Sequence, residues 1–202
     1  MRNELNRKIA FLFFIAFWGF PNIVFSADYN PLAVVVKKLQ FRAEAGESDA
    51  QFTLGKLYYY GFGIEHNFTK AIKWFRASAN HGHASAQFLL GEAHEKGNGL
   101  DRDYTQSAKY YKRAALGGHS LAIYRLSNLY AHGLGVRKNI IKAYAWNKLI
   151  TPCSWEMAKS LNIELEKIMD QEQFNQAKIL SIELKKKIRE QSQGTYFKSF
   201  LK

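Results

Sequence analysis

Cysteine, proline and long apolar runs are scarce in this chain. Its 202 residues include one cysteine, Cys153, and three prolines. A single cysteine cannot form an internal disulfide, which excludes the small disulfide-stapled scaffolds. We expect a buried thiol, with a covalent dimer as the alternative. No local signature supplies a base, so Cys153 is not expected to act as a nucleophile.

Catalytic and metal-binding signatures are missing as well. There is no His-Glu-x-x-His and no Gly-x-Ser-x-Gly in the sequence. His81, His83 and His94 are the nearest approach to a metal cluster, and they lack the spacing of tetrahedral ligands. We therefore expect a protein that is not an enzyme and that needs neither a metal nor a cofactor.

The longest apolar run, Ile9 to Phe20, has only twelve residues. It follows a basic head and precedes small residues at Val24 and Ser26. This pattern predicts a signal peptide over residues 1–26, cleaved after Ser26, and hence a periplasmic or secreted protein without a stable membrane span. An uncleaved anchor is the alternative, although a spanning helix needs about 20 apolar residues.

Basic residues outnumber acidic ones by 29 to 17, a net charge of +12. Loss of residues 1–26 would leave 26 against 16, a net charge of +10. Nucleic acid is not an expected partner of an exported protein, whereas anionic polysaccharide, lipid headgroups and acidic proteins are. The one dense basic run, Lys185 to Arg189, has a helical pattern and is interpreted as a solvated helix face.

The dominant feature of the sequence is an internal repeat of 36 residues. Two successive shifts by this period align glycines, alanines, leucines and aromatic residues without a gap. Three repeats are predicted over residues 45–150, at about 45–80, 81–116 and 117–150. The aligned sets include Gly46/Gly82/Gly118, Ala50/Ala86/Ala122, Leu54/Leu90/Leu126, Gly61/Gly97/Gly133, Gly63/Gly99/Gly135 and Trp74/Tyr110/Trp146.

Each repeat is predicted to contain two helices joined by a Gly-x-Gly turn. Apolar residues recur on one face from about Asp49 to Tyr60, and Gly61 can end that helix in the left-handed conformation. A phosphate-binding loop would instead follow a strand and occur once. The predicted N-caps of the second helices are Asn67, Asp103 and Asn139.

The period also indicates which side chains pack. Aromatic residues at positions 74, 110 and 146 are expected in the core. Small residues at positions 55, 91 and 127 are expected to let neighbouring helices approach closely. Asp103 with Gln106, and Asp170 with Gln173, have the spacing of a capping box.

The repeat resembles the Sel-one-like repeat (SLR) family, a relative of the tetratricopeptide solenoids. Residues 79–115 and 115–150 follow the family pattern, with Ser127, His94 and Ser107 as departures. The resemblance implies an all-α fold, an α/α superhelical solenoid, in a non-enzymatic adaptor. Family members linked to β-lactam binding carry paired cysteines, so that activity is not expected here.

The segments outside the repeats are expected to close the array, since terminal repeats are atypical. Residues 27–44 are predicted to form an N-terminal capping helix and residues 151–190 C-terminal capping helices. Residues 191–202 lack a clear period and are predicted to be a frayed tail.

Outward positions of the first helices vary between repeats, which leaves them free for recognition. We predict that they bind a protein partner on the concave face, while a purely solvated role stays open. The alternative function is binding of the cell wall or an anionic envelope glycan by the basic surface. The nine predicted positions are Thr53, Lys56, Tyr60, Leu89, Glu92, Lys96, Arg125, Asn128 and His132.

Overall fold

The computed structural model describes residues 31–150 and 155–200. The chain divides into a unit of residues 1–34 and a unit of residues 35–202, and the helix stack belongs to the second. The predicted signal peptide with its cleavage after Ser26, and Cys153, lie outside the described residues.

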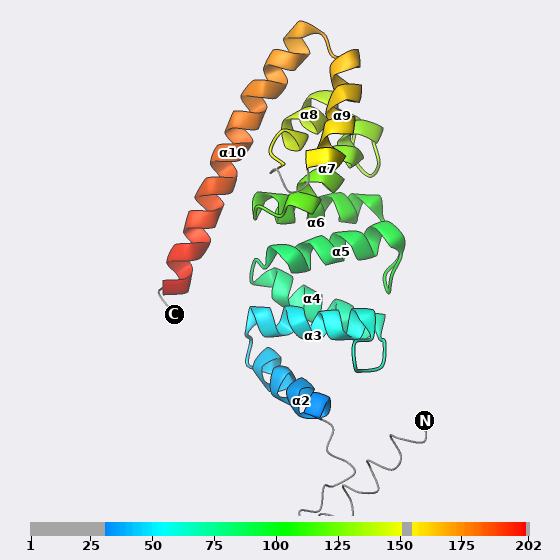
Figure 1. Ribbon diagram of the computed structural model, residues 1–202, viewed down its shortest axis with the longest axis vertical. Helices are drawn as coiled ribbons and strands as arrows, with labels where there is room; N and C mark the ends of the chain where they lie inside the picture. Colours follow the sequence, from blue (N-terminus) through cyan, green and yellow to red (C-terminus); the bar gives the residue numbers. More distant parts are fainter. Residues whose placement is uncertain (1–30, 151–154, 201–202) are drawn as a thin grey trace, which may run out of the picture. The chain divides into compact units, whose positions relative to one another are not determined.

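All regular structure in the described residues is α-helical, which confirms the predicted solenoid of helix pairs. Figure 1 shows the pairs stacked in chain order. The N-terminal helix α2 is Pro31–Glu44. The three pairs are α3 (Ser48–Tyr60) with α4 (Phe68–Asn80), α5 (Ala84–Lys96) with α6 (Tyr104–Leu116), and α7 (Ser120–His132) with α8 (Ile140–Asn147).

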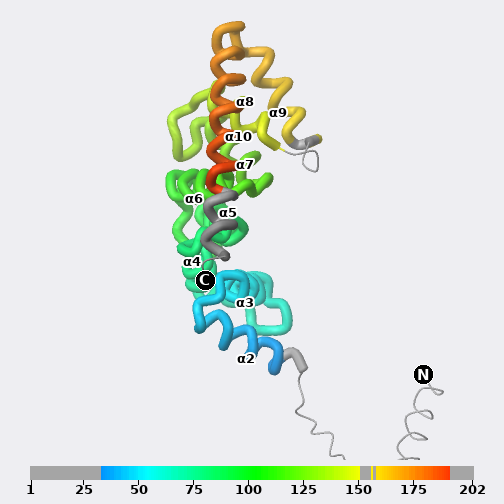
Figure 2. Tube along the Cα trace, turned by 90° about the vertical axis from the view of Figure 1, so that its left-hand side faces the viewer, coloured from blue at the N-terminus to red at the C-terminus, as the bar shows by residue number. Residues whose placement is uncertain are grey.

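Two further helices follow the repeats, α9 (Trp155–Ile168) and α10 (Gln171–Phe200). Figures 1 and 2 show that α10 runs back along the stack, where it contacts α8 and α6. The helix continues to Phe200, whereas the sequence predicted that it would end near residue 190.

The predicted helix boundaries are confirmed at atomic detail. Gly61 ends α3 with φ 68°, and Gly97 and Gly133 end α5 and α7 in the same left-handed conformation. The side chains of Asn67 and Asn139 accept hydrogen bonds from the backbone three residues on.

The two predicted capping boxes differ. Asp170 and Gln173 close theirs in both directions, with bonds of 3.2 and 2.8 Å. Asp103 caps α6 through Thr105 and Gln106, but its own N–H donates to the carbonyl of His94. The box at Asp103 therefore lacks the return bond from the Gln106 side chain, because the preceding turn already provides an acceptor for the Asp103 N–H.

Two histidines begin the first helices of the later repeats. Nδ1 of His83 accepts from the N–H of Ala86 at 3.2 Å, and Nδ1 of His119 accepts from Ala122 at 3.3 Å. The rings stack on Phe52 and Phe88, with centroids 4.4 and 4.5 Å apart. These histidines are structural N-caps.

The prediction for the core aromatic residues needs a correction. Trp146 is buried, but Trp74 and Tyr110 are only half-buried. In the first two repeats the position one residue further along holds a fully buried ring, Phe75 or Tyr111. A helix turns by 100° per residue, so this next position is the one that points at the small residues of the first helix.

The predicted role of those small residues is confirmed. A Cβ added to Gly55 would lie 2.6 Å from ring atoms of Phe75, and one added to Gly91 would lie 2.6 Å from Tyr111. Successive repeats are joined next to this contact. The side-chain amide of Gln87 donates to the carbonyl of Ala79 in the preceding helix at 3.2 Å.

Candidate protein-binding surface

The first helices of the three repeats, α3, α5 and α7, carry all nine predicted positions. Leu89 does not reach the surface: it is 6% exposed and packs in a cluster with Tyr59 and Phe75 of the preceding repeat. Leu89 is therefore part of the core and not available to a partner. The exposed positions are Thr53, Tyr60, Lys96 and His132, and the half-buried ones are Lys56, Glu92, Arg125 and Asn128.

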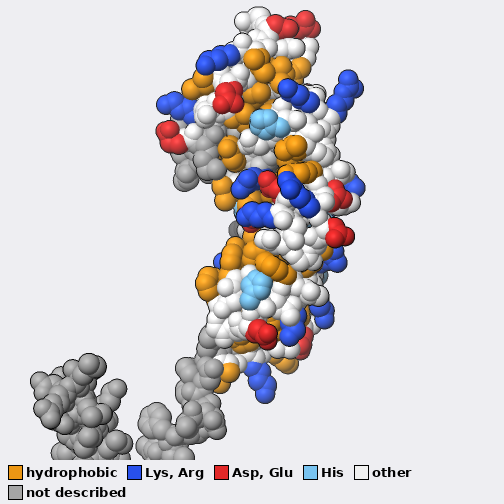
Figure 3. All heavy atoms as spheres, turned by 90° about the vertical axis from the view of Figure 1, so that its right-hand side faces the viewer, with side chains coloured by type: hydrophobic (Ala, Val, Ile, Leu, Met, Phe, Trp, Pro, Cys, Tyr) orange, Lys and Arg blue, Asp and Glu red, His pale blue; other side chains and the backbone are white. Residues whose placement is uncertain are grey.

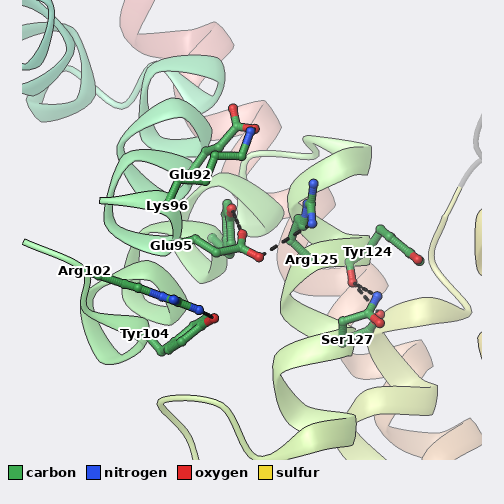
Figure 4. A network of polar contacts seen from close by, with 10 residues as sticks. Glu92, Glu95, Lys96, Arg102, Tyr104, Tyr124, Arg125 and Ser127 are labelled. Atoms are coloured by element: carbon green, nitrogen blue, oxygen red, sulfur yellow. Dashed lines mark hydrogen bonds and ion pairs between the residues drawn. The ribbon is translucent and has the colours of Figure 1, made fainter. Parts of the chain in front are cut away.

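Four of the nine positions interact with one another, and one of them, Arg125, also contacts a further residue, Glu95. This group of Tyr60, Glu92, Glu95, Lys96 and Arg125 is called the central polar cluster. Lys96 Nζ lies 2.5 Å from Glu92 Oε1, and Arg125 lies 3.5 Å from Glu95 Oε1. Figure 4 shows the Glu95 and Arg125 side chains pointing toward each other across α5 and α7.

Neighbouring groups in the cluster shift the pKa values of Lys96 and Tyr60 upward. Its hydrogen bond to Glu92 raises the pKa of the Lys96 ammonium, which therefore stays protonated. Partial burial, and then the Glu92 carboxylate, raise the pKa of the Tyr60 hydroxyl, which stays neutral. The cluster thus combines two acidic residues, two basic residues and a phenol.

Glu95 was missed by the sequence analysis. It accepts a hydrogen bond from the buried Tyr111 hydroxyl, whose pKa is raised by burial and then by this bond. The equivalent residues of the other repeats are Tyr59 and Ala131. Position 95 varies between repeats, but Tyr59 and Ala131 are buried, so the criterion of an outward and variable position would not have selected it.

One exposed aromatic side chain, Phe62, adjoins Tyr60 of the cluster. Tyr60 is 46% and Phe62 61% exposed, and their ring centroids are 5.4 Å apart. On the face displayed in Figure 3, hydrophobic side chains lie among basic and acidic ones, and neither sign of charge forms a continuous area. Aromatic residues and Arg are enriched at protein interfaces, whose rims are polar.

The remaining positions contribute less. Thr53 donates to the backbone of Asp49 at 2.8 Å, and Asn128 donates to the backbone of Tyr124 at 3.0 Å. The Lys56 ammonium lies 5.6 Å from the centre of the Phe52 ring. These side chains are engaged within their own helices and are not drawn into the central polar cluster.

The described residues contain neither a metal-binding cluster nor a membrane-spanning helix. No three His, Cys, Asp or Glu side chains there are placed to share an ion. None of the described helices is both long and apolar enough to cross a bilayer.

The stacked helix pairs define an α/α repeat solenoid. Three Sel1 repeats match at residues 48–83, 84–119 and 120–146, and the chain belongs to the Sel1 repeat family. Sel1 repeat proteins generally mediate protein–protein interactions, and the fold is typically a non-catalytic interaction scaffold. No curated protein matches the chain.

Two solved structures are similar. One is a protective antigen of uropathogenic Escherichia coli strains with an SLR fold, at 32% identity and a TM-score of 0.69, covering 81% of this chain and 35% of the antigen. The other is a Sel1 repeat protein of Oxalobacter formigenes, at 35% identity and a TM-score of 0.59, covering 64% of this chain and 97% of that one. The chain thus spans about a third of the E. coli antigen.

Proposed function

We propose that this chain is a non-enzymatic adaptor of the bacterial envelope or the extracellular space, which binds a protein partner. The observation that carries the proposal is the central polar cluster with the adjoining Phe62 ring. It joins side chains from three repeats into one surface, which includes Arg125 and Tyr60, residue types that dominate binding energy at protein interfaces.

The exported location rests on the signal-peptide pattern of residues 1–26. The similarity to a protective antigen of E. coli identifies no partner. A periplasmic and a secreted protein would carry the same signal, so the proposal covers both.

Binding of a cell-wall or anionic glycan is the second candidate, and the basic net charge favours it. A polyanion needs a row of cations, however, and both cations of the central cluster already face carboxylates. Dispersed charge would also be screened within about 8 Å at physiological ionic strength. A packed protein interface would resist salt better.

The test is affinity capture from envelope extract with the tagged protein as bait, washed in rising salt. The binding-surface variant combines Tyr60→Ala, Lys96→Glu and Arg125→Glu. The matched control carries Lys109→Glu and Lys112→Glu, two exposed lysines of α6. Both variants are first checked by thermal melting.

We expect one discrete protein that survives about 0.5 M salt, at which the screening length is only a few ångströms. It should be lost from the binding-surface variant and retained by the control. Acidic material that elutes equally from all three baits would contradict the adaptor and favour the glycan. Equal retention by all three baits of a salt-resistant protein would move the interface away from this cluster.

A further inference from the structure

A cavity of about 570 Å³ lies between α10 and the α7–α8 pair. This volume is within the range of roughly 300 to 1,000 Å³ that is usual for ligand pockets. Its walls are largely apolar and include Ile123, Ile150, Ile182 and Ile188. Ile123 and Ile150 belong to the buried core, whereas Ile182 is 70% exposed. An apolar ligand group would therefore extend the core.

Three cations complete the lining: Lys148 at the end of α8, and Lys185 and Arg189 on α10. Lys185 and Arg189 are four residues apart, so they project from the same face of the helix. All three are exposed, and none of the described residues that line the cavity is acidic. The cavity therefore has an apolar interior and a positively charged rim.

The charge of this rim is not compensated by the rest of the described chain. The ion pairs of the described residues involve Arg42, His83, Lys96, Arg125 and Lys186. None of them involves a rim cation. Lys148 approaches only the ring of Tyr144, at 6.0 Å from its centre. A ligand with more than one negative charge would meet three available cations.

The basic run from Lys185 to Arg189 is divided by this arrangement. The sequence suggested a solvated helix face, and that fits Lys186, which pairs with Glu190 at 4.0 Å, and Lys187. Lys185 and Arg189 instead line the cavity. Lys187 is thus a matched control on the same helix.

We propose that this cavity binds an acidic peptide segment of a partner protein. An apolar side chain would enter between α10 and α7–α8, while neighbouring Asp or Glu side chains would pair with Lys148, Lys185 and Arg189. A peptide supplies spaced carboxylates and apolar groups in one chain. A hydrated polysaccharide offers no apolar group for the interior, and a single fatty acid supplies only one charge. The inference deepens the proposed adaptor function and rests on it.

The test begins with a library of twelve-residue peptides displayed on phage, selected on the purified protein. Enriched peptides are synthesised with a fluorescent label, and their Kd values are measured by anisotropy. We expect sequences that combine at least two acidic residues with an apolar one. The variant Lys185→Glu/Arg189→Glu should weaken binding by about tenfold or more, because attraction becomes repulsion. Lys148→Glu and Ile182→Asp should weaken it as well.

Two controls locate the effect. Lys187→Glu changes the same charge on the same helix and should leave Kd within about twofold, since exposed charges away from the contact contribute little. The central-cluster variant Tyr60→Ala/Lys96→Glu/Arg125→Glu should also leave it unchanged. If the central-cluster variant abolishes peptide binding and the cavity variants do not, the cavity proposal fails and the adaptor proposal stands. Peptide binding at the cavity without partner capture at the central cluster would place the adaptor's interface on α10.

Other occupants are tested in parallel with dodecanoate and with phosphatidylglycerol vesicles. Binding of either probe that depends on Lys185 and Arg189, with no peptide that does, would overturn the proposal in favour of a lipid-like anion. Failure to enrich any acidic peptide, or equal affinity for the protein and for Lys185→Glu/Arg189→Glu, would also overturn it.

Discussion

The first two repeats and the third solve the same packing problem with different chemistry. In the first two, a glycine of the first helix lies under a fully buried ring of the second, Gly55 under Phe75 and Gly91 under Tyr111. In the third, Ser127 takes the place of the glycine and Asn147 that of the ring. The Ser127 hydroxyl donates to Asn147 Oδ1 at 3.2 Å.

The exchange of a ring for Asn147 lets the last repeat bind the C-terminal helix α9. Nδ2 of Asn147 donates to the carbonyl of Ala158 at 2.7 Å and to Asn162 Oδ1 at 2.9 Å, both on α9. A ring would fill the space but could not make these bonds. The third repeat thus exchanges apolar packing within the pair for a buried polar link to the C-terminal helices.

The neighbouring position changes in step. Tyr59 packs on Phe75 with centroids 5.7 Å apart, and Glu95 accepts from Tyr111. Ala131 of the third repeat instead packs in a cluster with Tyr144 of α8 and with Leu161, Leu165 and Ala177 of α9 and α10. The residue at this position therefore changes with the residue at the ring position: Tyr59 with Phe75, Glu95 with Tyr111, and Ala131 with Asn147.

The largest predicted effect comes from making the third repeat like the first. Asn147→Phe should lower the free energy of unfolding by about 3 kcal/mol or more, because buried partners lose their bonds and a ring meets Ser127. Urea unfolding measures the loss. Hydrogen exchange should show α9 released before α5 and α6.

A compensating change separates the two causes. Ser127→Gly in the Asn147→Phe background makes room for the ring and should recover part of the stability. Full recovery is not expected, since the carbonyl of Ala158 and the side chain of Asn162 still lack their partner. Complete rescue would show that the link to α9 contributes nothing.

The next largest effect is expected from Gly91→Ala in the second repeat. The added Cβ would lie 2.6 Å from Tyr111, whose ring is fully buried and cannot move freely, so we expect a loss of about 1 to 3 kcal/mol. Ser127→Ala is the control: the third repeat already holds a Cβ there, and only the contacts of the hydroxyl with Tyr124 and Asn147 are lost. A smaller loss for Gly91→Ala than for Ser127→Ala would contradict the comparison.

The features of the repeats that the sequence predicted depend on residues that are close to one another in the chain. The period, the left-handed Gly61 and the N-cap Asn67 each need only the few residues around them. The burial of Leu89 depends on a side chain from the preceding repeat. The role of Asn147 depends on how α9 docks, which no 36-residue pattern contains.

The Glu95–Arg125 contact depends on the same kind of information. It joins helices of different repeats, so the sequence predicted Arg125 as an outward residue without its partner. The apolar cavity beside α10 was not predicted either, because it exists only once that helix folds back on the stack. Position in the repeat was thus predictable, and contacts between repeats were not.

The repeats also differ in the N-caps of their first helices, and this difference predicts a dependence of stability on pH. Burial lowers the pKa of His83 and of His119 below the ordinary value of 6.5, so both caps require neutral rings. The unfolded chain binds the protons more readily. Stability should therefore be fully present above about pH 6.5 and decline as the pH falls through the lowered folded values.

The expected loss is about 1 kcal/mol per cap, because a proton on Nδ1 removes the acceptor for the backbone N–H. Melting curves between pH 7.5 and pH 5 measure it. His83→Asn/His119→Asn keeps a capping acceptor that does not titrate, and should flatten the pH dependence. The first repeat begins at Glu47, which makes no side-chain cap, and serves as the internal reference. An unchanged pH profile in the double variant would assign the decline to other groups.

The smallest effect is expected from Tyr111→Phe, which gives the second repeat the ring of the first. The ring packing over Gly91 stays, and only the hydrogen bond to Glu95 is lost. Because the Glu95 side chain is 21% exposed, water can replace the donor, and the expected loss is about 0.5 to 1 kcal/mol. Urea unfolding measures it, with Glu95→Gln as the matched variant. A loss above that of Gly91→Ala would mean that the hydroxyl, and not the close contact of ring and glycine, holds the second repeat together.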